Sequence, residues 1–220
     1  MTIASYNDLV TAVQNWLYGR TDLQARVPEF ISLCEAKLNR QLKCRQMIVR
    51  ETAMTDPNAT EPEFITLPAN FHSLARPPRI KAGAATGRPR LKYASALQID
   101  EIRFEFESNG ASPGEPQYYT VLGSELELVP TPDKAYTIEI ATRQYIPGLA
   151  NSNQTNWLIT LAPDAYLYGV LMEAAPYMHE DERIATWANG LTGAINGLNA
   201  LSDEATYNAG PLTMRRRGHY

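Results

Sequence analysis

The chain has 220 residues, of which 44% are hydrophobic and 20% charged, and its net charge is −4. This length allows one sizeable core, or one helical domain with a second small sheet domain. The negative balance argues against general nucleic-acid binding, which needs a basic surface. No stretch reaches the roughly 20 apolar residues that cross a bilayer. The first residues lack the basic start and apolar run of an export signal, so we expect synthesis in a cytosol and no membrane contact.

The N-terminal region predicts two helices arranged as an antiparallel hairpin. The first covers residues 6–18, with Ser5 as its cap, Asp8 as the reciprocal partner of a capping box, and Gly19 at its end. The second begins near Pro28, because proline suits the first turn of a helix. Its apolar stripe consists of Val27, Ile31, Cys34, Leu38 and Leu42.

The two cysteines, Cys34 and Cys44, are interpreted as core or surface thiols. If both lie on one helix, they are about 15 Å apart along its axis, whereas a disulfide needs Cα atoms closer than about 7 Å. Two thiols are also too few to build a zinc site. We therefore expect neither a bridge within the chain nor a metal centre.

The middle of the chain carries strand signals separated by breaks. Strands are predicted over residues 48–54 and 63–67, and the prolines and glycines of residues 68–89 predict a long irregular stretch. Residues 95–106 fit either a helix capped by Ser95 or an alternating strand. Of these two interpretations, the helix is favoured.

The clearest sheet signal follows. Segments 118–122 and 125–129 are separated by Gly123 and Ser124, a two-residue loop of the kind that joins hairpin strands. A third strand is predicted over 136–145, where apolar and polar residues alternate. Together these segments predict a meander of three antiparallel strands.

The last third of the chain is again helical. Pro163 lies in the first turn of one predicted helix, and Pro176, which lacks an N–H donor, should bend or end it. A final amphipathic helix follows the acidic residues 180–182, which suit the positive end of a helix. Its apolar positions are Ile184, Trp187, Leu191, Ile195, Leu198 and Leu201.

Three glycines, Gly190, Gly193 and Gly197, interrupt this final helix at spacings of three and four. Each should destabilise the helix by roughly 1 kcal/mol relative to alanine. Two interpretations stay open. In the first, the glycines arose by sequence drift and are tolerated without a function. In the second, they form a smooth face against which a helix of a neighbouring subunit packs.

These elements predict an α+β fold with one inserted domain. Residues 1–47 and 156–206 form a helical bundle from the N-terminal hairpin and the C-terminal helices, and residues 48–155 form a small antiparallel β domain between them. Residues 207–220 form a flexible basic C-terminal arm, because they have little to bury. The charged residues of the arm are Arg215, Arg216 and Arg217.

No catalytic signature is found. Gly83 and Gly87 are too closely spaced for a phosphate loop, and His72, His179 and His219 are scattered along the sequence. A catalytic pair of carboxylates needs a defined separation in a cleft, which residue counts do not reveal. We therefore expect no enzymatic activity, no cofactor and no metal ion.

Two regions, residues 6–40 and residues 156–183, carry packing residues in a characteristic order. In the first region these are the runs 6–10, 16–17, 26–31 and 35–40. The most telling blocks are Asn156-Trp157-Leu158, Ala162-Pro163-Asp164, Tyr166-Leu167-Tyr168-Gly169, Glu173-Ala174-Ala175-Pro176-Tyr177 and Asp181-Glu182-Arg183. This order resembles that of the head-to-tail adaptor proteins of tailed bacteriophages. Residues 75–115 match the family least.

The resemblance implies a structural subunit at the head-tail junction of a virion, assembled in the host cytoplasm. It implies a ring of copies, usually a dodecamer, beneath the portal protein. The ring extends the DNA channel and offers a platform to a tail nozzle or other tail proteins. DNA passes without specific binding, because an acidic body repels phosphates.

In such adaptors the C-terminal extension grips the portal. Residues 207–220 are therefore predicted to be mobile in the free protein and ordered on the portal. Apolar anchors and charged groups that pair with portal carboxylates are expected at Leu212, Met214, Arg215, Arg216, Arg217 and Tyr220. The alternative is a basic tail that only aids solubility.

Two other classes of protein remain open. A cell-wall hydrolase carried in the tail would show a deep cleft with two inward carboxylates. A small DNA-packaging or regulatory binding protein would show a basic face on its folded body.

Overall fold

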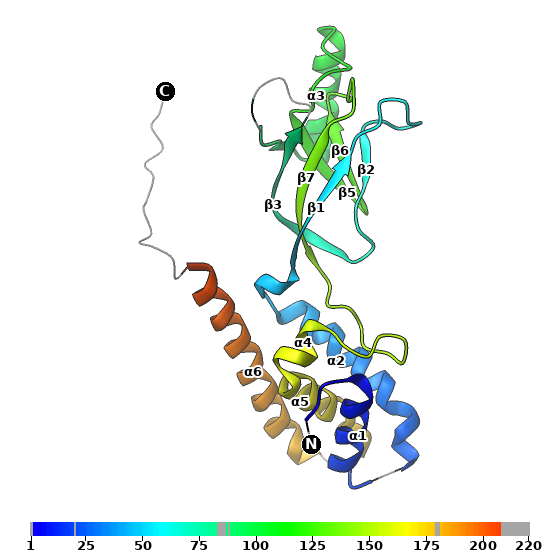
Figure 1. Ribbon diagram of the computed structural model, residues 1–220, viewed down its shortest axis with the longest axis vertical. Helices are drawn as coiled ribbons and strands as arrows, with labels where there is room; N and C mark the ends of the chain where they lie inside the picture. Colours follow the sequence, from blue (N-terminus) through cyan, green and yellow to red (C-terminus); the bar gives the residue numbers. More distant parts are fainter. Residues whose placement is uncertain (1, 20, 83–86, 88, 179–180, 208–220) are drawn as a thin grey trace. The chain divides into compact units, whose positions relative to one another are not determined.

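The computed structural model describes residues 2–19, 21–82, 87, 89–178 and 181–207. Contacts divide the chain into two compact units: unit 1 is Met1–Gln46 with Ile146–Tyr220, and unit 2 is Met47–Tyr145. The described part of unit 1 is helical, and unit 2 contains two small sheets and one helix (Figure 1). The α+β class predicted from the sequence is confirmed.

Unit 1 is built around helix α5, Pro163–Ala174. Apolar residues lie on all sides of α5, a pattern typical of a buried helix, and Tyr166, Val170 and Ala174 are fully buried. It packs against four other helices of the unit (Figure 1). These are α1, Tyr6–Trp16; α2, Val27–Gln41; α4, Trp157–Leu161; and α6, Asp181–Tyr207. Short 3-10 segments lie at Thr21–Arg26, Arg45–Met47 and Pro176–Met178.

The predicted helix ends hold with small changes. The hydroxyl of Ser5 accepts a hydrogen bond from the backbone N–H of Asp8 at 3.2 Å, which confirms the N-cap. However, α1 ends at Trp16 rather than at residue 18, because the chain turns with positive φ at Tyr18 and Gly19. Prolines lie in the first turns of α2 and α5, as predicted.

Unit 2 has one sheet of order β1-β7-β3 and one of order β2-β6-β5-β4. Neighbouring strands are antiparallel except β4 and β5, which are parallel. The strands are β1, Ile48–Met54; β2, Phe64–Thr66; β3, Phe71–Ala82; β4, Lys92–Tyr93; β5, Tyr118–Leu122; β6, Glu125–Val129; and β7, Thr137–Gln144. Buried residues of both sheets, among them Ile80, Leu126, Leu128 and Ile138, form one core.

The pairing of β7 corrects the predicted meander. β5 and β6 form the expected hairpin across Gly123 and Ser124. However, β7 pairs with β1 and β3 in the other sheet, so the prediction of three successive neighbouring strands is wrong. Alternation along residues 136–145 indicates which side chains share a face. It carries no information on which strand lies alongside.

Strand β3 corrects a second prediction, because it lies inside the stretch expected to be irregular. Pro77 and Pro78 are tolerated there because β3 is an edge strand, where a missing N–H donor does little harm. The pairing with β7 also shifts register between Arg76 and Arg79, around the two prolines. A bulge of this kind leaves residues out of the ladder without ending the strand.

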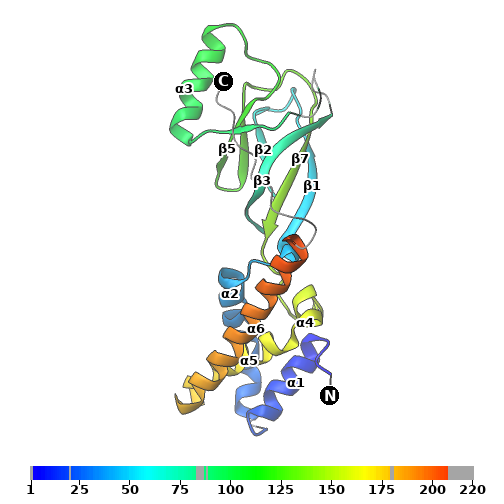
Figure 2. The same cartoon turned by 90° about the vertical axis from the view of Figure 1, so that its left-hand side faces the viewer.

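Helix α3, Ala96–Ser108, covers the outer face of the second sheet. Its capping box at Ser95 confirms the helix that was favoured over a strand. Ile99 of α3 is buried with Val129, whereas Leu128 points the other way into the core between the sheets. Unit 2 therefore has three layers: α3, the β2-β6-β5-β4 sheet and the β1-β7-β3 sheet. Figure 2 shows α3 and β1 on opposite sides of the unit.

Candidate interaction surfaces

In unit 1, Glu35 of α2 holds residues 146–156 against the helices. Its Oε1 accepts hydrogen bonds from the backbone N–H of Leu149 at 2.7 Å and from the hydroxyl of Tyr166 at 3.1 Å. Asn156 donates to the same hydroxyl at 2.7 Å. Burial raises the pKa of the Glu35 carboxyl, and the two hydrogen bonds oppose this only in part.

A carboxyl group with a raised pKa is what a general acid requires. The accepting oxygen of Glu35, however, is occupied by two donors of its own chain. This arrangement positions a loop and a buried tyrosine. Among residues 2–207, with the gaps stated above, no group of three or more His, Cys, Asp or Glu side chains could hold a metal ion.

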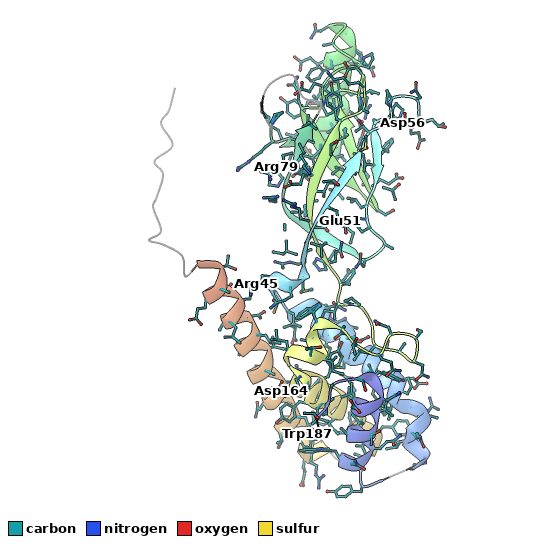
Figure 3. All side chains as sticks on the ribbon, in the orientation of Figure 1. Arg45, Glu51, Asp56, Arg79, Asp164 and Trp187 are labelled. Atoms are coloured by element: carbon teal, nitrogen blue, oxygen red, sulfur yellow. The ribbon has the colours of Figure 1, made fainter. Side chains whose placement is uncertain are left out.

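An aromatic cluster lies at the meeting point of α1, α5 and α6; Figure 3 labels its Trp187. The rings of Trp16 and Trp187 meet edge to face at 5.4 Å, and Trp187 also stacks on Tyr168 at 6.1 Å. Arg183 donates to the hydroxyl of Tyr18 at 2.6 Å and lies 5.3 Å from its ring centre. The cluster borders a hollow of about 570 Å³. Trp16 and Tyr18 are 48% and 68% exposed.

The three glycines of α6 differ in their surroundings. A Cβ atom at Gly190 would lie 2.9 Å from the ring of Tyr168, so the missing side chain allows a contact within the chain. At Gly193 and Gly197 the same atom would meet nothing within 4 Å. These two positions line a groove of about 320 Å³ together with the exposed Leu161 and Leu201.

On the outer face of the β1-β7-β3 sheet, three arginines converge on one carboxylate. Glu139 of β7 is only 3% exposed. Arg79 donates to its Oε1 through Nε at 3.0 Å and Nη2 at 2.8 Å, and Arg76 donates to the same oxygen. Nη1 of Arg50 lies 3.7 Å from Oε2. Arg79 lies opposite Glu139 in the pairing of β3 with β7, and Figure 3 labels it beside β3.

This cluster has a surplus of positive charge. Burial raises the pKa of Glu139, but the hydrogen bond from Arg79 and the charges of the three arginines outweigh it and hold the pKa below its ordinary value. The carboxylate stays ionised and neutralises only one of three cations. Arg143 lies on the same face, because residues four apart on a strand point the same way. Its buried Nε has no acceptor in the described part of the chain. We call Arg50, Arg76, Arg79 and Arg143 the arginine face.

The arginine face was not foreseen from the sequence. Arg76 and Arg79 lie in the stretch predicted to be irregular, and Arg50 lies on a strand whose partner was unknown. The available signal was the position of Glu139 among the outward residues of an alternating strand. Three arginines meet it only because β7 pairs with both β1 and β3.

The predicted portal-binding residues lie outside the described residues, and His179 and His219 lie outside them as well. Those portal-binding residues are Leu212, Met214, Arg215, Arg216, Arg217 and Tyr220. His72 is described: its Nδ1 lies 3.1 Å from the Ser73 hydroxyl, and its ring packs edge-on against Tyr145.

Comparison with known protein families identifies a family for this chain. The family described as "SU10 adaptor protein" matches residues 4–215. No curated protein matches the chain. In the described part of the chain, none of the helices has the length and apolar character needed to span a membrane.

Proposed function

The chain belongs to the SU10 adaptor protein family of phage head-to-tail adaptors. From this premise we propose that it forms a ring beneath the portal protein, connects head to tail and extends the DNA channel. The observation that carries the proposal is the family match over residues 4–215, which includes the described helices of unit 1 and all of unit 2. Membership of a structural adaptor family is consistent with a protein that is not an enzyme.

Two surfaces of unit 1 support contacts with neighbouring copies or other virion proteins. The aromatic cluster combines Trp, Tyr and Arg side chains, the residue types that contribute most to binding at protein interfaces. The groove beside Gly193 and Gly197 leaves the backbone of α6 open to close approach. In the proposed ring, a helix of the next copy packs in this groove.

The charge of the protein suits a channel. The net charge of −4 has the same sign as the DNA phosphates. Like charges repel, so DNA slides past without the counterion release that drives non-specific binding.

Residues 207–220 are proposed to grip the portal. Ordering this arm costs about 1–2 kcal/mol per residue in backbone entropy, so many contacts must form together. The apolar Leu212, Met214 and Tyr220 and the three arginines provide such contacts.

The proposal is tested by the mass of the purified protein with and without portal, measured by light scattering. We expect a monomer or a weak assembly alone, and a closed ring of copies on the portal. A mass that portal leaves unchanged would contradict the proposal. A stable ring at micromolar concentration without portal would contradict only the dependence of assembly on portal.

Deleting residues 207–220 tests the arm separately. We expect the melting temperature and helical content of the free protein to stay nearly unchanged, and co-purification with portal to be lost. Undiminished portal binding by the truncated protein would assign docking to the folded body.

A further inference from the structure

The outer side of helix α3 is acidic and apolar. Leu97 and Phe104 are 82% and 72% exposed. Acidic residues spaced three and four apart along the helix share this side with them. The basic residue of α3, Arg103, points inward and donates to the buried Glu127. We call this surface the α3 ridge; it consists of Leu97, Asp100, Glu101, Phe104 and Glu105.

The arginine face is complementary to the α3 ridge in charge and in apolar character. It carries a surplus of positive charge, and the side chains of Arg50 and Arg76 are 66% and 46% exposed. Ile48 and Met54 lie on the same side of β1 as Arg50 and are 43% and 69% exposed. Each surface therefore combines charges of one sign with exposed apolar side chains.

The two surfaces lie on opposite sides of the three-layer unit 2 (Figure 2). A single copy therefore cannot bring its own arginine face to its own α3 ridge. Two copies can, and the pair then still presents one unused α3 ridge on the first copy and one unused arginine face on the second. A head-to-tail contact of this type repeats from copy to copy and closes into a ring when the rotation between copies allows it.

We propose that the arginine face of one copy binds the α3 ridge of the next copy, so that unit 2 joins neighbouring subunits head to tail. This inference rests on the proposed ring. Each guanidinium has five N–H donors in a planar fork that suits a carboxylate. Glu139 holds the guanidiniums of Arg76 and Arg79 in place before the partner arrives. Fewer side-chain rotamers are then lost on binding.

DNA is the competing ligand, because a basic face also suits phosphates. The apolar residues favour the second copy. Leu97 and Phe104 gain from a contact that removes them from water, and Ile48 and Met54 provide a matching surface. The phosphates of DNA provide no apolar surface for Leu97 and Phe104.

A charge swap in the full-length protein tests the contact. The variant with Glu101→Lys and Glu105→Lys should assemble on portal about tenfold more weakly than the wild type, because like charges then face each other. Adding Arg50→Glu should recover most of the loss. Arg76 and Arg79 still bind Glu139 in that variant. The control with Glu29→Lys and Glu61→Lys makes the same change in net charge at exposed sites outside all the proposed contact surfaces and should assemble normally.

Cross-linking provides the direct test. Thr52 lies opposite Glu139 on the arginine face, and Phe104 lies on the α3 ridge. The variant with Thr52→Cys and Phe104→Cys, oxidised on the portal, should give a ladder of covalently joined copies. Each single variant should give no ladder. The native Cys34 and Cys44 are buried and do not interfere.

The outcomes separate the two proposals. If the wild type forms a ring but the lysine variant assembles normally and no ladder appears, the inference is wrong and the proposed function stands. If the wild type forms no ring on the portal, both the proposed function and the head-to-tail contact of unit 2 are wrong. If the wild type binds a short duplex DNA, and Arg50→Glu abolishes that binding without changing ring assembly, the arginine face belongs to DNA and the inference is wrong.

Discussion

Glu35 in unit 1 is half-buried and Glu139 in unit 2 is buried, and the groups that surround the two carboxyls differ in charge. Glu35 meets two neutral donors, a backbone N–H and a tyrosine hydroxyl, and burial raises its pKa. Glu139 meets three arginines, which lower its pKa despite burial. The surroundings of Glu35 therefore favour its protonated form, whereas those of Glu139 favour the carboxylate.

The difference shows how one residue type serves two purposes. Neutral donors around Glu35 position a loop and Tyr166 without adding charge to unit 1. Cations around Glu139 order guanidiniums and leave unit 2 with a positively charged face. Because the single charge of Glu139 neutralises only one of the three arginines, the surface around it keeps a positive charge. Such a surface is suited to bind an anionic partner.

Substitutions in the two cores should have the largest effect on stability, and they test whether the two units unfold separately. Leu128→Ala in unit 2 and Leu171→Ala in unit 1 each remove a buried side chain and should cost about 3 kcal/mol. Hydrogen exchange should accelerate in the strands for the first variant and in the helices for the second. Equal acceleration in both units for either variant would show that they unfold as one.

Replacing Glu35 separates its hydrogen bonds from its charge. Glu35→Ala removes the acceptor for Leu149 and Tyr166 and should lower the free energy of unfolding by about 2 kcal/mol. Glu35→Gln keeps an acceptor oxygen and should stay within about 0.5 kcal/mol of the wild type at neutral pH. Denaturant titration measures both. An equal loss in the two variants would mean that the charge, not the acceptor, matters.

A smaller effect is expected at the capping box of α3. Ser95→Ala should lower the free energy of unfolding of unit 2 by about 1 kcal/mol, because the N–H of Gln98 loses its acceptor. Hydrogen exchange in the first turn of α3 should accelerate most. Exchange in β1 and β7 serves as the internal control. Unchanged exchange in that first turn would contradict the role of the cap.

The smallest expected effect concerns how the stability of the folded protein depends on pH. The folded pKa of Glu35 is raised above 4.5, so its contribution to stability is full below pH 4.5 and is lost as the pH rises through the folded value. The folded pKa of Glu139 is lowered, so its contribution is full above pH 4.5 and is lost as the pH falls through the folded value. Melting curves of Glu35→Gln and Glu139→Gln across this range should deviate from the wild type in opposite directions.

Elements with local signals can be predicted from the amino-acid sequence. A serine cap at Ser5, a glycine turn at Gly123 and proline in the first turn of α5 each act within a few residues, and each matches the structure. The α+β class followed, because helical stripes and alternating strands differ in period. The family resemblance also followed, since it rests on packing residues in a fixed order.

Tertiary structure alone decided which strands pair and what meets on their faces. Residues 48–54 and 137–144 are far apart in sequence, and β7 pairs with β1 rather than with the nearby β6. β7 lies between β1 and β3 with its alternate residues in a core that both sheets share. This arrangement brings Arg50, Arg76 and Arg79 to Glu139. Strand pairing lowers the free energy through the burial of whole faces, a quantity that no short segment of the chain carries.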